Sequence, residues 1–224
     1  MPYEQQKTVL VAAVQRIYEV HQAEIEALKA HQVDIARPDF VWHYLLQSFS
    51  TMGRASGWHG LIGNRVNYNR ITYPALQPLT ETQRRVVVED TCRDAKVRMP
   101  GNKAEFILRC FDQITALGGL EAVKAALFAI PGRDGKINYL RQFHGIGPKY
   151  ARNMMMDVYQ EDFRESIAID SRIQSVSTAL GVQFDGYADH EQFYLDVAHA
   201  AGINGWELDR LMFNFQKEVL AAIR

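Results

Sequence analysis

Residues 139–153 (YLRQFHGIGPKYARN) constrain this chain more than any other stretch. They predict a helix, a tight turn over residues 145–147, and a second helix that begins at Pro148. A proline costs nothing at the first helical position, because its missing N–H would have no partner there. The two glycines of the turn allow backbone angles that side chains block, and they let another backbone approach closely. The free amides at the start of the second helix, with the positive end of its dipole behind them, form a ready site for a phosphate.

Positive charge gathers around the same turn. From residue 131 to residue 152 the sequence has one acid, Asp134. The basic residues of this stretch are Arg133, Lys136, Arg141, Lys149 and Arg152. The whole chain carries a net charge of −1. That value argues against a protein that coats nucleic acid indiscriminately, but it is compatible with a local basic surface.

The turn resembles the helix-hairpin-helix of one DNA glycosylase superfamily, the endonuclease III and 8-oxoguanine glycosylase group, which carries a Gly/Pro-rich loop and a downstream aspartate. The family's hairpin reads approximately Leu-Pro-Gly-Val-Gly-x-Lys. This chain has Phe143-His-Gly-Ile-Gly-Pro-Lys149, so His144 replaces the usual proline. Lys149 falls on the position of the family's nucleophilic lysine, and Asp170 falls on its aspartate. A hairpin alone occurs in many non-enzymatic DNA-binding proteins, whereas hairpin, lysine and spaced aspartate together are much more specific.

The resemblance implies a base excision repair enzyme, a DNA glycosylase with an associated abasic-site lyase activity that acts on damaged double-stranded DNA. An N-glycosidic bond breaks through a cation-like sugar, which a nearby carboxylate stabilises. Lys149 would attack C1′ with assistance from Asp170, and the resulting Schiff base would allow elimination to break the strand. Many relatives carry an iron–sulfur cluster held by four cysteines near the C-terminus. This chain has no cysteine after Cys110, so we expect no cofactor and favour an oxidised purine such as 8-oxoguanine as the damaged base.

Two other functions fit the same residues. The first is a monofunctional DNA glycosylase, in which Asp170 activates a water molecule and Lys149 only binds. The second is a non-catalytic helix-hairpin-helix protein that binds DNA or a protein partner. In that case Lys149 is a solvated or phosphate-binding lysine and Asp170 simply caps the helix that follows it.

The resemblance also predicts the residues that contact DNA. The backbone of Gly145, Ile146 and Gly147 would hold a phosphate, with a monovalent cation at the hairpin carbonyls as in relatives. Further contacts are expected from Arg141, His144 and Arg152. The family inserts a plug into the base stack near the end of an earlier helix, where this chain has Phe49 or Ser50, although Phe49 is equally well explained as a core residue. Arg54 would contact the orphaned base or a phosphate, and its alternative role is that of a plain surface arginine.

Residues 57–79 are rich in Gly, Asn and Pro and predict a long loop, a kind of segment that is often functional. Its aromatic residues, interleaved with arginines, could stack on bases. Trp58 and His59 are candidates for the base pocket, together with Trp206. The alternative is that the aromatic residues of this loop only attach it to the body of the protein.

The fold is expected to be all-α, because no stretch alternates convincingly except the very short Ile167–Ile169. Helices are predicted over residues 4–30, 40–49, 80–96, 102–117, 120–130, 171–180, 189–201 and 206–224, in addition to the hairpin at 139–159. Asp39, Thr80, Asn102 and Asp134 are expected to cap helices. The family pattern predicts a helical barrel subdomain over 38–165 that carries the hairpin, and a second subdomain in which 1–37 packs with 166–224, with the lesion pocket between the two.

Composition supports an ordinary globular protein, with 47% hydrophobic and 23% charged residues. No apolar run approaches the length of a membrane span, and the start of the chain lacks the apolar segment of a signal peptide. Cys92 and Cys110 lack the neighbours of a zinc site or a disulfide framework. We therefore expect a monomer with no metal and no membrane partner, cytoplasmic and nucleoid-associated in a prokaryote or nuclear in a eukaryote.

Overall fold

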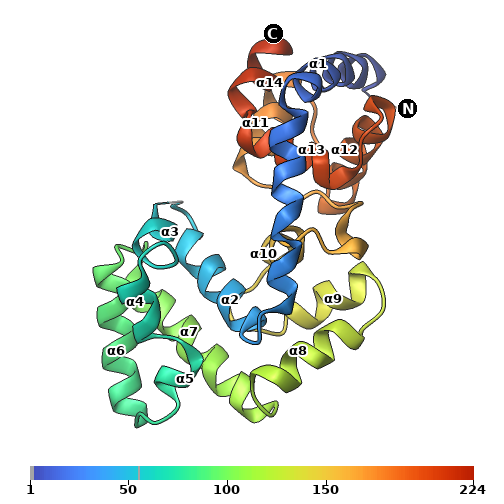
Figure 1. Cartoon of the computed structure of the whole chain (residues 1–224). Helices are drawn as coiled ribbons and strands as arrows, with labels where there is room; N and C mark the ends of the chain where they lie inside the picture. The colour runs from blue at the N-terminus through green and yellow to red at the C-terminus, as the bar shows by residue number, and fades with distance from the viewer. Residues whose placement is uncertain (1–2, 55) are drawn as a thin grey trace. The chain divides into compact units, whose positions relative to one another are not determined.

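The computed structural model describes residues 3–54 and 56–224. Over these residues all regular structure is helical: α-helices up to α14 and two short 3-10 helices, with no strand (Figure 1). The predicted all-α class is therefore confirmed. No helix in the described part of the chain is long and apolar enough to cross a membrane.

Contacts divide the chain into two compact units. One combines the residues up to Val33 with Met155–Arg224, and the other is Asp34–Met154. We call them the terminal unit and the central unit. The division expected from the sequence placed the boundaries after residues 37 and 165.

The terminal unit is built on α1 (Glu4–Leu28), which packs against three C-terminal helices; these are α12 (Tyr187–Ala201), α13 (Gly205–Asn214) and α14 (Gln216–Ala222). Figure 1 shows this group, in which the blue α1 lies beside the red helices. The apolar stripe predicted on α1 is buried and includes Leu10, Val14, Ile17 and Ile25. A further helix, α11 (Ser171–Leu180), contacts α13 and α14. After Leu28 the chain continues as a 3-10 helix over Lys29–Ala36.

The single helix predicted from Trp206 to the end of the chain is wrong, because the chain bends at Phe215. There the N–H of Phe215 closes α13 on Leu211 O, and the carbonyl of Phe215 accepts the first bond of α14 from Glu218. The Phe215 ring stacks on His21 of α1, with ring centroids 3.7 Å apart and planes at 16°. This contact with α1 accompanies a bend that sequence periodicity does not reveal.

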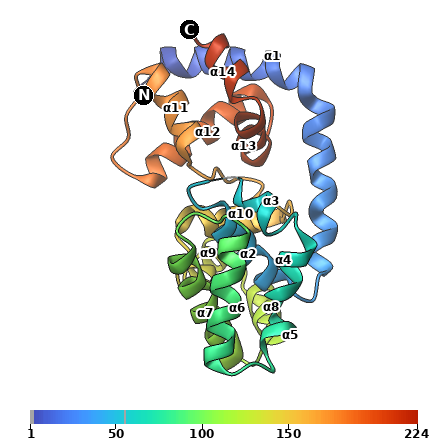
Figure 2. The ribbon, with the colours of Figure 1, turned by 90° about the vertical axis from the view of Figure 1, so that its left-hand side faces the viewer.

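The central unit surrounds α2 (Phe40–Thr51), whose side chains are buried nearly all round, as predicted. It contacts α7 (Pro100–Ala116) and α8 (Leu120–Ala129). Figure 2 shows α7 beside α6 (Glu81–Asp94), and α9 (Arg133–Leu140) follows α8 into the hairpin. The largest core side chain on α2 is Trp42, whose indole N–H donates to Ile71 O at 2.9 Å.

Residues 57–79 are not a long loop. They form three short helices, α3 (Gly57–Gly60), α4 (Arg65–Arg70) and α5 (Tyr73–Leu76). The glycines that suggested a loop instead permit close packing, since a Cβ at Gly57 would collide with Ser50 O and a Cβ at Gly60 with Ala95 O. Glycine composition was therefore a misleading signal here.

The four expected caps have different outcomes. Thr80 forms the predicted capping box with Gln83 at the start of α6. Asn102 caps nothing, because α7 already begins at Pro100. Asp134 lies in the first turn of α9, after its N-cap Gly132. Asp39 precedes α2 without a side-chain cap bond, since its carboxylate accepts from Arg37 and from the Tyr68 hydroxyl.

Candidate active site

The hairpin of the central unit has two glycines with different roles. Gly145 adopts φ +84°, which L side chains rarely adopt, and a Cβ there would lie 2.6 Å from the Phe106 ring. Gly147 has no such φ, and a Cβ on it would meet nothing within 4 Å. Both glycines were expected to allow backbone angles that side chains block, but only Gly145 adopts such an angle. Gly147 instead leaves open space in which another molecule can approach the backbone.

Backbone amides line this turn. The second hairpin helix, α10 (Pro148–Met156), begins at the predicted proline, and its first turn closes with a 3.0 Å bond from Ala151 N–H to Gly147 O. Within the described residues, the N–H groups of Gly145, Gly147 and Lys149 have no recorded acceptor. Such amides, at the positive end of a helix, can bind an anion. The N–H of Ile146 cannot, because it already donates to Phe143 O, and the Ile146 side chain is buried.

Lys149 is half-buried in the first turn of α10. Its Nζ lies 4.9 Å from the centroid of the Tyr150 ring. No ion pair with a carboxylate is recorded for it among the described residues of the central unit. The amine is therefore held loosely, by a ring face and by the backbone geometry of the turn.

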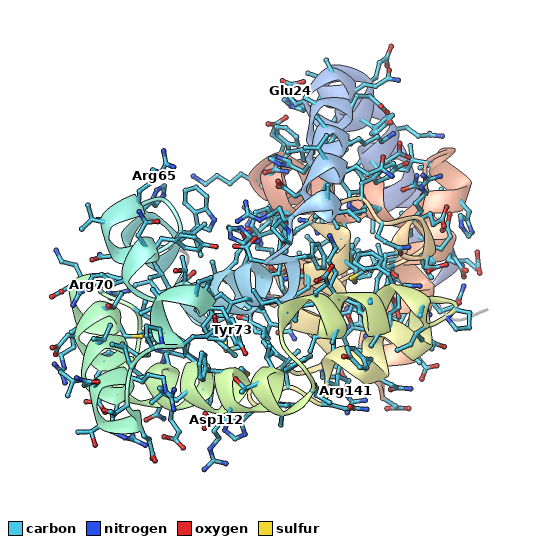
Figure 3. The ribbon with its side chains drawn as sticks, turned by 60° about the horizontal axis from the view of Figure 1, so that its bottom comes forward. Glu24, Arg65, Arg70, Tyr73, Asp112 and Arg141 are labelled. Atoms are coloured by element: carbon cyan, nitrogen blue, oxygen red, sulfur yellow. The ribbon has the colours of Figure 1, made fainter. Side chains whose placement is uncertain are left out.

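The other predicted hairpin contacts divide into exposed and buried residues. Arg141 and His144 are exposed, and Figure 3 shows Arg141 pointing outward. The His144 ring packs edge-on against Phe106, with centroids 5.0 Å apart. Arg152 is only 8% exposed and donates to Pro148 O at 3.3 Å. Arg152 thus stabilises the start of α10, and it is too buried to make the contact with DNA that was predicted for it.

Asp170 belongs to the terminal unit, where it caps α11 as predicted. Its Oδ1 accepts from Arg172 N–H at 2.9 Å and from Ile173 N–H at 3.1 Å. Within the described residues no hydrogen bond is recorded for Oδ2. The carboxylate is therefore oriented by one oxygen, and the other is available for chemistry.

The three residues before Asp170 are fixed by side chains from distant positions. Glu191 accepts from Ile167 N–H at 3.0 Å, and Asp209 accepts from Ala168 N–H at 2.8 Å. The Tyr187 hydroxyl is within hydrogen-bond distance of Ile169 N–H and donates to Ile167 O at 2.7 Å. We call Tyr187, Glu191 and Asp209 the anchor residues. They hold buried, non-helical backbone that would otherwise leave its polar groups unpaired.

Asp209 connects this scaffold electrostatically to Asp170. Burial raises the pKa of Asp209 to about 6, while Arg210 and the Ala168 N–H lower it and the charges of Asp170 and Asp157 raise it further. None of the three anchor residues was predicted from the sequence. The available signal was an acid among apolar neighbours, since Asp209 shares the buried face of α13 with Leu208 and Met212.

The structure corrects the predicted plug. Phe49 and Ser50 are each 1% exposed. Phe49 packs on Phe106, with ring centroids 5.7 Å apart, and the Ser50 hydroxyl donates to Gln47 O. The alternative explanation of Phe49 as a core residue therefore holds, and neither residue projects outward as a plug must. Arg54, three residues beyond the end of α2, is exposed.

The base-pocket candidates also divide. Trp58 is 40% exposed and His59 is exposed beside it. Trp206 is 1% exposed, and its indole N–H donates to Met156 O. Trp206 is thus a core residue of the terminal unit, because its ring is buried and its indole N–H is hydrogen-bonded there.

The remaining aromatic residues of 57–79 fasten that stretch to the central unit. Tyr73 bonds Thr115 through its hydroxyl at 2.8 Å, and Tyr68 bonds both Asp39 and His43. Figure 3 shows Tyr73 among the helices, whereas Arg65 points away from them. The attachment role proposed as an alternative is therefore correct for these two tyrosines.

No group of three or more potential metal-binding His, Cys, Asp or Glu side chains occurs in the described part of the chain. Both cysteines are buried, which raises the pKa of the Cys92 and Cys110 thiols to about 12. A thiol in such an environment is inert.

Comparison with known proteins gives a consistent result for the fold. No protein-family model matches the sequence, and no curated protein matches it. Three solved structures resemble it over nearly their whole length. The 8-oxoguanine DNA glycosylase of Methanocaldococcus jannaschii is 14% identical, with a TM-score of 0.72 and coverage of 95% of each chain.

The second is the M. jannaschii 8-oxoguanine glycosylase/lyase in complex with a 15mer DNA containing 8-oxoguanine. It gives a TM-score of 0.68 at 14% identity, over 93% of this chain and 97% of that chain. The 8-oxoguanine DNA glycosylase of Thermotoga maritima gives 0.67 at 17% identity, over 93% and 96%. The resemblance inferred from the hairpin is thus confirmed at the level of structure: this chain has the fold of these 8-oxoguanine DNA glycosylases.

Proposed function

We propose that the protein is a base excision repair DNA glycosylase with an associated abasic-site lyase activity, and that it removes an oxidised purine such as 8-oxoguanine from double-stranded DNA. One observation carries the proposal. In a chain with this fold, Lys149 occupies the first turn of a helix that starts directly after a glycine turn with open amides.

The chemistry follows from the two candidate catalytic side chains. The Lys149 amine attacks C1′ as the bond from C1′ to the base breaks, and the departing base takes up a proton. The Asp170 carboxylate stabilises the positive charge on the sugar and accepts the proton that the attacking amine loses. The bond from C1′ to the sugar ring oxygen then breaks, and that oxygen takes a proton and remains on the sugar as a hydroxyl, which leaves an imine between Lys149 and C1′. Loss of a proton from C2′ then expels the 3′ phosphate and breaks the strand on the 3′ side.

Two features favour a purine substrate. The three structures of the same fold are all of 8-oxoguanine glycosylases. The chain also has no cysteine after Cys110, and in the family the pyrimidine-type members commonly carry the four-cysteine cluster. Trp206 is buried in the core, so the exposed Trp58 and His59 are the remaining candidates for contact with the damaged base.

The test is a panel of duplexes, each with one damaged base, incubated with the wild-type protein and with Lys149→Gln. We expect release of 8-oxoguanine and strand cleavage by the wild type, and neither by the variant. Borohydride during the reaction separates the bifunctional from the monofunctional enzyme, because only an imine leaves a covalent adduct. If no damaged base is released from any duplex that the protein binds, the non-catalytic alternative is correct.

A further inference from the structure

An open hollow of about 700 Å³ lies at the end of α6, where the chain turns toward α7. Its lining is strongly basic and includes no acid; the lining residues are Gly53, Arg54, Arg93, Lys96, Val97, Arg98, Met99 and Pro100. All of them belong to the central unit. We call this feature the basic hollow.

Most of this positive charge has no acidic partner among the described residues of the central unit. Arg93 pairs with Glu89 and Asp90. In contrast, Arg54, Lys96 and Arg98 are exposed and have no recorded acidic partner within the central unit. Three unpaired cations around one hollow repel one another, and a bound anion would relieve that repulsion.

A fourth cation, Lys103, lies three residues after Pro100 in α7 and interacts electrostatically with Arg98. Lys103 is 9% exposed, and the recorded contacts of its Nζ are the Met52 Sδ at 3.1 Å and the Phe106 ring, whose centroid is 4.8 Å away. Neither is an anion. Burial lowers the pKa of Lys103, and the charge of Arg98 lowers it further. A buried ammonium without a counter-ion costs free energy, and an anion in the hollow would reduce that cost.

The backbone of the hollow is strained as well. Lys96 and Met99 have φ of +53° and +54°, a region that residues other than glycine seldom occupy. Lys96 follows the C-cap of α6, the position where helices usually place glycine. A lysine at this position makes the fold less stable than a glycine would. Backbone strain of this kind is found most often at functional sites.

The Phe106 side chain contacts both the hairpin and Lys103, which lies close in sequence to the basic hollow. Lys103 lies over the Phe106 ring, and the same ring contacts His144 and occupies the space that a Cβ on Gly145 would need. Phe106 follows Lys103 by one helical turn of α7, so one face of that helix serves both features. We propose that the basic hollow is a second phosphate site, which binds a backbone phosphate of the DNA held at the hairpin, through Arg54, Lys96 and Arg98.

This inference rests on the proposed function for the identity of the anion, since free phosphate has the same chemistry. The experiment measures duplex affinity at several salt concentrations, with undamaged DNA and with DNA containing 8-oxoguanine. The test variant is the double substitution Lys96→Gln with Arg98→Gln. The matched control is Arg16→Gln with Lys217→Gln, which removes two positive charges from exposed helix positions of the terminal unit.

For the test variant we expect weaker binding to both duplexes, and a slope of log K against log salt that is shallower than wild type by about 1 to 2. The control variant should keep the wild-type slope. An unchanged slope in the test variant overturns the proposal. A second result would also overturn it. In that result inorganic phosphate raises the thermal stability of the wild type but not of the test variant, while the salt slope of DNA binding is the same for both. The site then binds free phosphate and not DNA.

Activity and binding separate the two proposals. If 8-oxoguanine is excised but the salt slope is unchanged, the glycosylase stands and the second phosphate site fails. If the slope changes on undamaged DNA and nothing is excised, the phosphate site stands and the proposed catalytic function fails.

Discussion

Lys149 and Asp170 are held in opposite ways. Lys149 depends on backbone geometry: a left-handed glycine, a proline at the start of α10, and a side chain whose recorded neighbour is the Tyr150 ring. Asp170 depends on side chains, because its own Oδ1 caps α11 and the anchor residues fix the three residues before it. In the proposed mechanism the loosely held group moves to attack, and the rigid group stays in place to stabilise charge.

This difference predicts different responses to substitution around Lys149 and around Asp170. A change at the hairpin should act through the turn or through the amine itself. A change near Asp170 should act through orientation and through the charge of the buried Asp209.

Lys149→Gln should lower the rate of base release by roughly a thousandfold or more, because an amide cannot attack C1′ or form an imine. Single-turnover kinetics on an 8-oxoguanine duplex measures this. The stability of the variant should match wild type within about 0.5 kcal/mol, since the side chain makes few contacts. A rate within tenfold of wild type would show that the amine only binds.

Asp170→Asn and Asp170→Ala separate the proposed catalytic role of that carboxylate from its role as a helix cap. Asparagine caps helices as well as aspartate does, so Asp170→Asn should keep wild-type stability while the rate falls by about 10² to 10⁴. Asp170→Ala should lose the rate and also about 1 kcal/mol of unfolding free energy. Urea unfolding and single-turnover kinetics on both variants test this pair. Undiminished excision by a folded Asp170→Asn variant that still binds DNA would remove Asp170 from the mechanism.

Gly145→Ala and Gly147→Ala test the contrast within the hairpin. The first places a Cβ against the Phe106 ring at a left-handed φ, and should cost about 2 to 4 kcal/mol of stability. The second meets open space, so stability should change by less than about 1 kcal/mol. Its DNA affinity should fall nevertheless, because the methyl group occupies the approach to the amides. Equal stability loss in both variants would contradict the distinct roles of the two glycines.

Asp209→Asn tests the anchor residues through pH. The pKa of Asp209 is about 6 in the folded protein against an ordinary value of 3.8, so the folded state binds this proton more tightly than the unfolded state. Its contribution to stability is therefore full below pH 4 and declines as pH rises to 6. Asparagine keeps an acceptor for the Ala168 N–H. The variant should gain roughly 2 to 3 kcal/mol relative to wild type between pH 4 and pH 7.5, as measured by urea unfolding. A pH-independent difference would contradict the raised pKa.

Lys96→Gly should stabilise the protein slightly. Glycine removes the strain at φ +53°, and we expect a gain of up to about 1 kcal/mol. The same change removes one cation from the basic hollow, so duplex affinity should fall. A thermal melt and a binding titration on one preparation check both signs. A variant that gains stability and keeps full affinity would show that Lys96 does not contact DNA.

The sequence predicted the hairpin turn correctly because its signals are local. Gly145, Pro148 and Lys149 fall within five residues, and each has a backbone or chemical reason to be there. Asp170 as a helix cap was equally local. The all-α class followed from helical periodicity and from the near absence of strand patterns.

The anchor residues could not be predicted in the same way. Tyr187, Glu191 and Asp209 reach the backbone before Asp170 from 18 to 41 positions along the chain, so their partners are set by tertiary packing. The predicted DNA-contact roles of Phe49 and Trp206 were wrong for a related reason. An aromatic residue suits stacking on a base and packing in a core equally well, and only burial distinguishes the two. The glycines of 57–79 were misread because close helix packing and a loop use the same residue.

The most direct test of the central claim is to trap the reaction of the wild-type protein on an 8-oxoguanine duplex with borohydride and to map the adduct by mass spectrometry. The account predicts a covalent link from the Lys149 side chain to the sugar, formed in the same reaction that releases the base. Release of the base without any adduct, or an adduct on another residue, would contradict it.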